Sequence, residues 1–529
     1  METNTAKPLD VLIAGAGPVG LMMGCLLALH HISFRIIDKK TSVPVYSGAL
    51  IVHARTMEVF HQLGIAEKAL EAGIIARGIH IRFNHKKNYF LNMSAFGKSL
   101  TRFPYLLMIE QGQTVSLLSQ FLKDQGHWVE RDRSLMGFTQ ENNRVTSQIS
   151  KPDGSIELVK SRFLIGADGH ESVVRKQLNI PFPGKTQASR LFITDCKARL
   201  PISSKEIFFF FSNDVTSGFF PLKGNLWRID GLIPVIQQEK AGFEEVRNFF
   251  SKKLSSEIHL SKPRWFSVFR SHSRCATLFR HKQCFLMGDA AHVHSPVGAQ
   301  GMNTGLQDAH NLAWKLAFVI HELADEKLLD TYQAERRPLA LNIIRYTDWV
   351  YSFMTSHSVL SRFTRLQLFP RVLPLVLSLL SKSPHLCSRI FSSVSGIGIR
   401  YKKSNLTASF PHGDFPDHSP KPGERLPYFT YEQRGKKVSL DDGLVPTTFY
   451  LFVFGKHLLP ASFQTVVQEY KNVLSLKHIE DDSVTQSLFK LFGIKEAGCY
   501  LVRPDLYIAW RCQGFDEKGL SNYLKQALK

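Results

Sequence analysis

The sequence predicts a multidomain α/β fold, in which a first domain built on a parallel sheet carries a mainly β insertion and a small α/β domain follows. Three observations predict it. The segment 9–38, "LDVLIAGAGPVGLMMGCLLALHHISFRIID", has the pattern strand, glycine turn, helix, strand. Residues 185–275 are rich in strand-like segments, and residues 403–427 contain five prolines and little apolar periodicity, which indicates a linker. With 529 residues, 44% of them hydrophobic, the chain is large enough for two or three domains.

Local patterns predict the individual elements. Val11 to Ala14 is a continuous apolar run, as expected for a parallel strand buried on both faces. The turn signals "ENN" and "KPDG" divide residues 130–167 into hairpins that end in a second buried strand, Phe163 to Ile165. Helical periodicity resumes after Gly305. Beyond the linker, the strands "TTFYLFVF" and "GCYLVRPDLYIAWR" enclose a helical segment.

The charge balance is strongly basic, with 66 Lys and Arg against 45 Asp and Glu and a net charge of +21. The basic residues are scattered, and no RNP-type, zinc-finger or helix-turn-helix pattern accompanies them. We therefore expect no nucleic-acid partner and interpret the charge as a generally basic surface.

The cysteines and the N-terminal segment favour a cytoplasmic protein. Seven cysteines stand far apart without a CxxC pair, which argues against a disulfide framework and a structural zinc site. "METNTAKPLD" runs directly into a strand, without the pattern of a signal peptide. The most apolar run, Val372 to Leu380, contains Pro374 and is shorter than the roughly 20 residues that span a bilayer. We expect it to be core or, at most, a surface-binding stretch, so peripheral membrane contact stays open and a transmembrane segment is not expected.

The turn after the first strand is a G-x-G-x-x-G motif formed by Gly15, Gly17 and Gly20, with Pro18 inside it. Its context makes it informative, because it follows a buried strand, opens a helix and precedes Asp38 at the end of the next strand. The first glycine makes the tight turn, the second lets a pyrophosphate approach, and the third lets helix and strand pack closely. The helix N-terminus adds partial positive charge, and Asp38 can accept hydrogen bonds from a ribose hydroxyl. The pattern predicts a Rossmann-like dinucleotide site.

A second loop, "GDAAHVHSPVGAQGMNTG" at 288–305, lies some 270 residues further along and ends in closely spaced glycines. A second contact so distant in sequence suits a long cofactor, and FAD is the one it favours. With the "FLIGADGHESVVRKQLNIPFPG" stretch, these segments give three fingerprints in order. The chain thereby resembles the class A flavoprotein monooxygenases, in particular the phenol hydroxylase-like branch of the p-hydroxybenzoate hydroxylase family. "SGALIVHARTMEVFHQLG", "LLDTYQAERRP" and the terminal "LVRPDLYIAWR" match further segments, so the resemblance covers nearly the whole chain.

The resemblance implies a domain division. Residues 1–182 and 276–402 would form a discontinuous FAD-binding domain with a helical segment, and 183–275 an inserted β-sheet substrate domain. Residues 403–427 would be the linker and 428–529 a thioredoxin-like domain. Because that domain lacks a CxxC pair, we expect it to serve packing or dimer support and not disulfide exchange.

The resemblance also implies site residues for non-covalently bound FAD. Arg55 would contact the pyrophosphate, Gln111 and Asp289 the ribityl chain, and Asp168 would lie near the pyrophosphate with a second role toward the pyridine nucleotide. Pro296 and the backbone from Gly298 to Asn303 would line the isoalloxazine. The cofactor-binding set is therefore Gly15, Gly17, Pro18, Gly20, Asp38, Lys39, Arg55, Gln111, Asp168, Asp289, Pro296, Gly301, Met302 and Asn303. No protein side chain is assigned the catalytic step, because the flavin carries the chemistry.

Several positions depart from the family pattern. Gly48 stands where many relatives carry Arg or Lys, in a loop that the flavin passes as it moves. Ala299 replaces a frequent Gly, Ser295 a frequent Pro, and Leu506 a frequent Gly of the terminal motif. None of these removes an implied cofactor ligand.

The function implied is hydroxylation of an aromatic, phenolic substrate, in which NAD(P)H reduces FAD and a flavin C4a-hydroperoxide formed with O₂ delivers the hydroxyl group. Three alternatives stay open: a hydroxylase of polycyclic or antibiotic-type aromatics, an uncoupled NAD(P)H oxidase or flavin reductase on the same fold, and a non-catalytic FAD-bound partner protein. No metal is expected, because His292 and His294 lack a third ligand at suitable spacing. Trp227, Arg228 and Phe208 to Phe211 are candidates for a substrate wall, although an aromatic strand more often forms core. A monomer and a homodimer are both compatible with the sequence.

Overall fold

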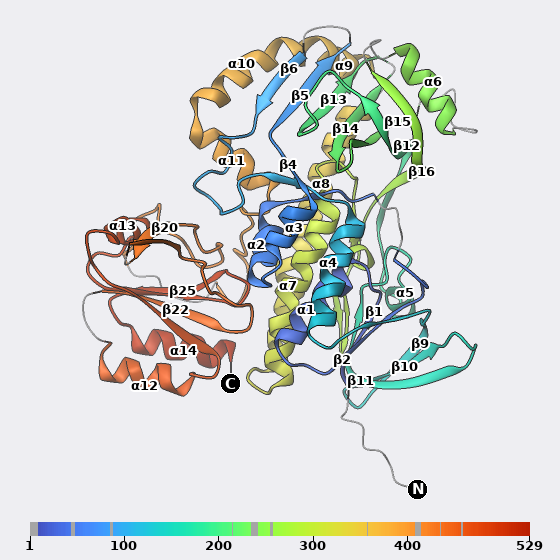
Figure 1. Cartoon of the computed structure of the whole chain (residues 1–529). Helices are drawn as coiled ribbons and strands as arrows, with labels where there is room; N and C mark the ends of the chain where they lie inside the picture. Colours follow the sequence, from blue (N-terminus) through green and yellow to red (C-terminus); the bar gives the residue numbers. More distant parts are fainter. Residues whose placement is uncertain are drawn as a thin grey trace.

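In the computed structural model of the chain, the positions of most residues are described; those not described are 1–8, 44–47, 85–87, 214, 234–241, 254–257, 357, 408–413, 434, 456–458 and 529. Figure 1 shows a large body that contains two sheets, with the C-terminal part beside it.

The first sheet is parallel at its centre. Strand β1 (Leu9–Ala14) lies between β2 (Phe34–Asp38) and β11 (Ile156–Gly166) and runs parallel to both, with Leu12 opposite Arg35 and Leu164. The expected turn at Asn142 and Asn143, both with positive φ, joins two strands of a hairpin that continues into β11. The other strands of this sheet are β8 (Val129–Arg131), β9 (Ser134–Glu141), β10 (Arg144–Ser150), β17 (Arg280–His281) and β18 (Cys284–Leu286).

Helices α1 (Pro18–Leu29), α4 (Gln111–Asp124) and α7 (Gln300–Ile320) pack together beside this sheet (Figure 1). Helix α1 begins with proline, which suits the first helical position because its missing N–H has no partner there. It is apolar on nearly all sides and buried between its neighbours. Smaller elements complete this part: β3 (Ile51–Val52), β4 (Ile74–Ala76), β7 (Leu106–Met108), α2 (Ala54–Gln62), α3 (Ala66–Ala72) and α5 (Val173–Gln177).

The second sheet has the order β19-β16-β12-β15-β14-β13-β5-β6. Its strands are β5 (Gly78–Phe83), β6 (Asn88–Asn92), β12 (Gly184–Arg199), β13 (Glu206–Phe211), β14 (Thr216–Leu222), β15 (Leu226–Leu232), β16 (His259–Cys275) and β19 (His292–Val293), and α6 (Phe243–Lys253) follows β15. Two of these, β5 and β6, come from the range 1–182 that the sequence assigned wholly to the first domain. The alternating pattern of a strand does not reveal which sheet the strand joins, and here β5 adds to the edge of β13 in parallel.

A helical segment follows α7: η3 (Glu326–Leu329), α8 (Asp330–Thr355), α9 (Val359–Phe363), η4 (Thr364–Leu368), α10 (Phe369–Lys382) and α11 (Pro384–Val394). Helix α10 lies along β5 and β6, where Leu366 and Leu373 contact Phe83 and the Tyr89 hydroxyl donates to the Pro370 carbonyl at 3.0 Å (Figure 1).

The C-terminal part contains a four-stranded sheet of order β23-β22-β24-β25. Its elements are β20 (Thr430–Gln433), β21 (Lys436–Ser439), β22 (Phe449–Phe454), α12 (Ala461–Glu469), β23 (Leu474–Ile479), α13 (Gln486–Phe492), β24 (Gly498–Val502), β25 (Ile508–Gln513) and α14 (Glu517–Ala527). Cys499 and Cys512 are paired in register across the consecutive strands β24 and β25, and both thiols are free.

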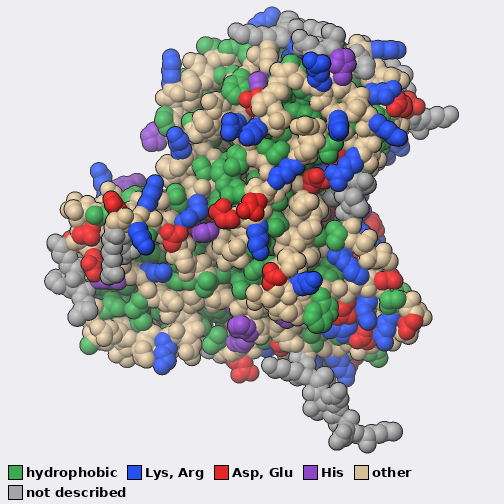
Figure 2. All heavy atoms as spheres, in the orientation of Figure 1, with side chains coloured by type: hydrophobic (Ala, Val, Ile, Leu, Met, Phe, Trp, Pro, Cys, Tyr) green, Lys and Arg blue, Asp and Glu red, His purple; other side chains and the backbone are tan. Residues whose placement is uncertain are grey.

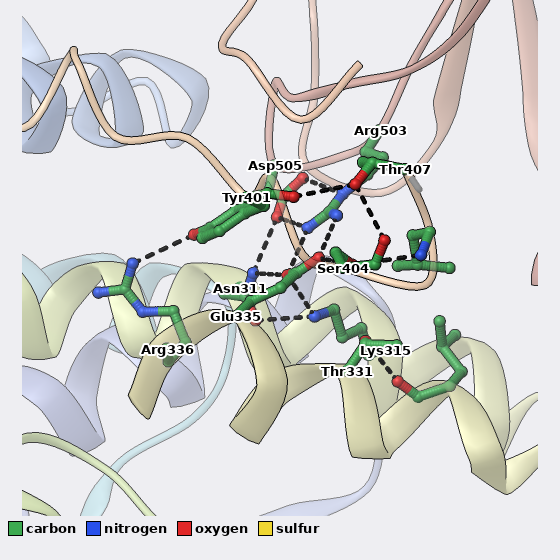
Figure 3. A network of polar contacts seen from close by, with 12 residues as sticks. Asn311, Lys315, Thr331, Glu335, Arg336, Tyr401, Ser404, Thr407, Arg503 and Asp505 are labelled. Atoms are coloured by element: carbon green, nitrogen blue, oxygen red, sulfur yellow. Dashed lines mark hydrogen bonds and ion pairs between the residues drawn. The ribbon is translucent and has the colours of Figure 1, made fainter. Parts of the chain in front are cut away.

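A buried network of charged side chains joins the C-terminal part to α7 and α8 (Figure 3). The Glu335 carboxylate accepts two hydrogen bonds from Arg503, at 2.6 and 2.9 Å, and one each from Lys315, Asn311 and Ser404. Burial alone would raise the pKa of Glu335, but Arg503 and Lys315 lower it strongly. The terminal motif therefore fastens the C-terminal part to the first domain.

Leu506 lies in the turn of this motif with φ of +62°, the left-handed region that favours glycine. This explains in physical terms why glycine is frequent at the position. Leu506 is buried in the core of the C-terminal sheet, and that burial offsets the strain.

Candidate cofactor and substrate site

The three glycines of the first turn differ in what a side chain would meet. A Cβ at Gly15, whose φ is +105°, would lie 2.3 Å from the Ala167 carbonyl oxygen, and a Cβ at Gly20 would lie 1.9 Å from the Gly15 oxygen. A Cβ at Gly17 would meet no atom within 4 Å. The fold itself therefore requires Gly15 and Gly20, whereas Gly17 faces open space at the N-terminus of α1.

Asp38 holds the same turn from the end of β2. Its carboxylate accepts the Ala16 N–H at 2.7 Å and the Lys40 N–H at 2.8 Å. A carboxylate has roughly four acceptor positions, so both oxygens keep capacity for further donors. Asp38 and Lys39 line a cavity of about 220 Å³ together with Gly15 and Gly17.

A larger cavity of about 920 Å³ lies between the first sheet and the second. The two cavities share lining residues, among them Gly17, Pro18 and Gln111. The larger one brings together most of the remaining predicted residues, which come from distant parts of the chain: Gln111, Asp289, Pro296, Gly298, Gly301 and Met302. Continuous space thus runs from Asp38 past the glycine turn to the 288–302 loop.

Two left-handed residues shape that loop before α7. Gly298 has φ of +79° and Ala299 has φ of +51°. The His53 side chain braces the loop by a hydrogen bond of 3.0 Å between its Nε2 and the Gly298 carbonyl. Ala299 therefore occupies a conformation that costs an L-residue roughly 1 kcal/mol and that glycine adopts freely.

The two histidines of the loop have different surroundings. His292 contacts the Asp308 carboxylate at 2.7 Å, and Arg336 donates to the other Asp308 oxygen at 2.8 Å. His294 lines the larger cavity, and burial lowers its pKa to about 4, so its ring is neutral. Among the described residues, no group of three or more His, Cys, Asp and Glu side chains is arranged to hold a metal ion.

Two acidic residues at the cavities lack a full set of partners. Asp289 lines the larger cavity, from which its side chain is accessible, and the surrounding protein raises its pKa through desolvation. Asp168 lines the smaller cavity, and its Oδ2 accepts the Val173 and Val174 N–H groups at 2.7 and 3.2 Å. Within the described part of the chain its buried Oδ1 has no hydrogen-bond partner. An unpaired buried acceptor is costly, so a donor from a ligand would be favourable there.

Arg55 and Asn303, also expected at the cofactor, line neither of these two cavities. Arg55 is buried, and its guanidinium donates to Glu58 at 2.9 Å and to the Asp505 carbonyl at 2.6 Å. The Asn303 side chain accepts the His53 N–H and the Thr56 hydroxyl and donates to the Ile51 carbonyl. The contacts with Asp505, His53, Thr56 and Ile51 could not be inferred from the local sequence, since these partners lie 247 to 450 positions away.

The second sheet forms the opposite wall, and the alternation along β13 divides its aromatic run. Phe209 and Phe211 line the larger cavity, whereas Phe208 and Phe210 point into the core behind the sheet. The same division holds for β15, where Arg228 lines the cavity and Trp227 is core. The aromatic run therefore contributes alternate residues to the cavity and to the core, and a substrate wall formed by the cavity-lining residues stays a prediction.

Arg228 brings a positive charge to the loop at position 48. It pairs with Asp195 through two hydrogen bonds of 2.8 and 2.9 Å, and Trp265 donates to the same carboxylate at 2.6 Å. Its remaining nitrogen donates to the carbonyl oxygens of Gly48 and Ala49 at 3.3 and 3.1 Å. A fixed cation thus lies beside this loop even though Gly48 itself carries none.

Asp230, two residues beyond Arg228, was not anticipated from the sequence. It faces the same cavity, and its Oδ1 accepts the Gly218 N–H at 3.1 Å. Burial raises its pKa to about 6, against a smaller lowering by Gly218 and Arg228. The i, i+2 spacing from Arg228 is the only sequence signal that could have placed it on the cavity face.

Comparison with known proteins identifies the family. The model of the FAD binding domain matches residues 8–347, and that of the aromatic-ring hydroxylase C-terminal domain matches residues 419–529. The 6-methylpretetramide 4-monooxygenase of Streptomyces rimosus is 31% identical over 95% of this chain and 91% of its own length. The chain belongs to the FAD-dependent aromatic-ring monooxygenases. It is a flavoprotein monooxygenase with FAD as cofactor.

Further relatives support this assignment. The pentachlorophenol 4-monooxygenase of Sphingobium chlorophenolicum is 32% identical over 66% of this chain and 65% of its own. The structure of the anhydrotetracycline hydroxylase OxyS from Streptomyces rimosus has a TM-score of 0.77 at 29% identity and covers 98% of both chains. An aklavinone-11 hydroxylase solved with FAD and aklavinone has the same fold, with a TM-score of 0.78 at 21% identity over the full length of both chains.

Proposed function

We propose that FAD lies along both cavities of this monooxygenase. The pyrophosphate would rest at the turn of Gly15, Gly17 and Gly20, and Asp38, with Lys39 beside it, would bind the adenosine ribose. The open space at Gly17 carries this proposal, because a phosphate can approach the backbone only where no side chain projects.

The flavin end of the cofactor would occupy the part of the larger cavity nearest the 288–302 loop. Asp289 and Gln111 would bind the ribityl chain, and Pro296 with the backbone from Gly298 to Met302 would lie against the isoalloxazine. Asp168, whose buried Oδ1 has no hydrogen-bond partner among the described residues, would accept from the cofactor or from a pyridine nucleotide. Arg55 and Asn303 are left out of this set because they hold neighbouring elements together.

The substrate would lie between the flavin and the second sheet. Phe209, Phe211 and Phe220 give this wall an apolar surface suited to a flat ring, and Arg228 and Asp230 give it two polar groups. A hydroxyl group on the ring would place its proton within reach of Asp230. We infer a phenolic aromatic substrate for which NAD(P)H is the reductant.

Bound FAD, once reduced, supplies the activation of O₂ and the transfer of one oxygen atom to the ring. The protein positions the ring and handles its proton. A phenolate is a better nucleophile than a phenol, so the Asp230 carboxylate would raise the reactivity of the ring by accepting the hydroxyl proton. The aromatic wall would keep water away from the reacting centre.

A polycyclic phenol is the second candidate substrate. The relative that spans nearly the whole chain and is named for a pretetramide supports it. An uncoupled NAD(P)H oxidase remains the alternative activity, and it requires no substrate wall.

The seven cysteines are buried and free, in keeping with a reducing, cytoplasmic setting.

The test is a panel of simple and polycyclic phenols, supplied with NADH or NADPH to the FAD-loaded protein. A substrate should stimulate NAD(P)H oxidation and yield a product one oxygen atom heavier. Stimulation by polycyclic phenols alone would select the second candidate. Oxidation that no ring accelerates would favour the oxidase alternative.

A further inference from the structure

The segment from Val359 to Val394, comprising α9, η4, α10 and α11, is apolar on two opposite sides. One side packs on the second sheet through Leu366, Leu373 and Leu377, and its Leu380 joins the core that contains Cys387 and Phe391 of α11. The other carries Leu368, Val372, Leu375 and Leu379, which repeat at helical spacing and are all exposed. The run from Val372 to Leu380, expected to be core or a surface-binding stretch, is therefore half core and half surface.

This outer face continues beyond α10. Leu386 and Ile390 of α11 and Val359, Leu360 and Phe363 of α9 are exposed as well. A soluble protein seldom exposes so many large apolar side chains along neighbouring helices unless something covers them. By length and composition alone the stretch Val359–Lys382 could cross a membrane. Because its other side is packed against β5 and β6, it can lie only on a membrane surface.

The charged residues of this segment have one sign. From Trp349 to Gly413 the sequence contains no Asp or Glu and eight Lys and Arg. Arg362, Arg371, Lys382 and Arg389 are exposed, and within the described part of the chain no carboxylate forms an ion pair with any of them. On the face visible in Figure 2, the part that holds the second sheet and α10 displays many more Lys and Arg than Asp and Glu.

We propose that the outer face of α9, α10 and α11 binds the surface of an anionic lipid bilayer. Exposed leucines flanked by Lys and Arg are the combination by which an amphipathic helix lies in the headgroup region. Anionic headgroups neutralise the basic residues, and each such residue near the surface adds to the attraction. A symmetric contact with a second copy would instead place Arg371 and Lys382 of both copies against like charges.

Attachment to a membrane would favour substrates that dissolve in the bilayer. Arg365 and Phe369 of the same segment, with Phe353 of α8, line the larger cavity from inside. The wall of the cavity and the membrane-facing surface are thus two sides of one helical layer. An apolar aromatic compound dissolved in the bilayer would be concentrated next to it.

Flotation of the FAD-loaded full-length protein with vesicles tests the proposal. Vesicles of equal parts phosphatidylcholine and phosphatidylglycerol should bind the protein, and vesicles of phosphatidylcholine alone should bind it weakly. Leu375→Glu with Leu379→Glu should lower the affinity at least tenfold, because these side chains are 66% and 60% exposed and would lose their place in the lipid. Arg371→Gln with Lys382→Gln should weaken binding at low salt and have little effect at high salt.

The matched control is Ile156→Glu with Leu158→Glu, at 61% and 66% exposure on β11. These changes remove equal apolar surface and should leave vesicle binding unchanged. The proposal is overturned if the wild-type protein fails to float with anionic vesicles. It is also overturned if Leu375→Glu with Leu379→Glu and Arg371→Gln with Lys382→Gln each bind as wild type does. It is also overturned if the protein does not bind vesicles but forms a dimer that Leu375→Glu with Leu379→Glu dissociates. The readout is lipid binding, so it is independent of whether hydroxylation is the activity.

Discussion

At the scale of single residues, three acids at the cavities differ in what already holds them. Asp38 is bonded to the backbone of the turn, Asp230 to the Gly218 N–H, and Asp289 has its side chain accessible from the larger cavity. Asp289 is therefore the acid whose removal should affect the cofactor most and the fold least.

Asp289→Ala should weaken FAD binding on the order of tenfold to a hundredfold. The change removes a charge-assisted acceptor, a bond worth roughly 1.5–3 kcal/mol, and each 1.4 kcal/mol corresponds to about a factor of ten. Quenching of flavin fluorescence on titration into apoprotein gives the dissociation constant. The control is Asp124→Ala at the exposed end of α4; equal constants for wild type and Asp289→Ala would remove Asp289 from the site.

The raised pKa of Asp230 predicts that the rate of hydroxylation depends on pH. Because its pKa is raised to about 6, hydroxylation should increase as the pH rises through about 6, where the carboxylate ionises. Asp230→Asn should turn over more slowly and lose this step in the kcat profile. A profile for the variant that still rises near pH 6 would assign the step to another group.

The raised pKa of Asp230 also predicts that stability, in contrast to activity, falls as the pH rises. A carboxyl group with a raised pKa contributes stability that is present below its unfolded pKa near 4 and lost as the pH rises through about 6. At pH 7, Asp230→Asn should therefore unfold at a higher temperature than wild type, and at pH 4 the difference should vanish. A variant that is both slower and less stable at pH 7 would indicate a structural role.

At the scale of elements, the glycine turn before α1 separates binding from folding. Gly17→Val should give a folded protein without FAD, because the side chain enters open space at the helix N-terminus. Gly20→Ala should destabilise the fold by about 1–3 kcal/mol, because its Cβ would lie 1.9 Å from the Gly15 oxygen. Absorbance at the flavin band and thermal unfolding distinguish the two. Full flavin content in Gly17→Val would mean that the pyrophosphate lies elsewhere.

Element patterns also show how far the sequence can predict this protein. The glycine turn and the hairpins depend on local residues, so their positions follow from the sequence. Helix α7 begins at Gln300, before Gly305, after which the helical periodicity was expected to resume. The run Phe208 to Phe211 predicts a strand but not which residues meet the cavity. The contact of Arg55 with Asp505 could not be predicted, because the two residues lie 450 positions apart. The outer face of α10 could not be distinguished from a core-facing side, since apolar periodicity alone does not show which side of a helix packs against a neighbouring element.

At the scale of the whole molecule, the network of Figure 3 helps to join the C-terminal part to the first domain. Glu335→Gln should destabilise the protein by about 3–5 kcal/mol, because it leaves the buried Arg503 and Lys315 with one carboxylate fewer. Asp414→Asn, which breaks the exposed pair with Lys495, should change stability by less than about 1 kcal/mol. Since the pKa of Glu335 is lowered, the advantage of wild type should fade as the pH falls below about 4. Equal unfolding temperatures for the two variants at pH 7 would contradict this role.

The most direct test of the account is the fate of molecular oxygen. The FAD-loaded protein, given NAD(P)H, ¹⁸O₂ and a phenol that stimulates NAD(P)H oxidation, should yield a product that carries one ¹⁸O atom on its ring. Mass spectrometry of the product measures this. If every such ring is recovered unchanged and the labelled oxygen appears only as hydrogen peroxide, the protein is an oxidase and the aromatic wall of the second sheet is not a substrate site.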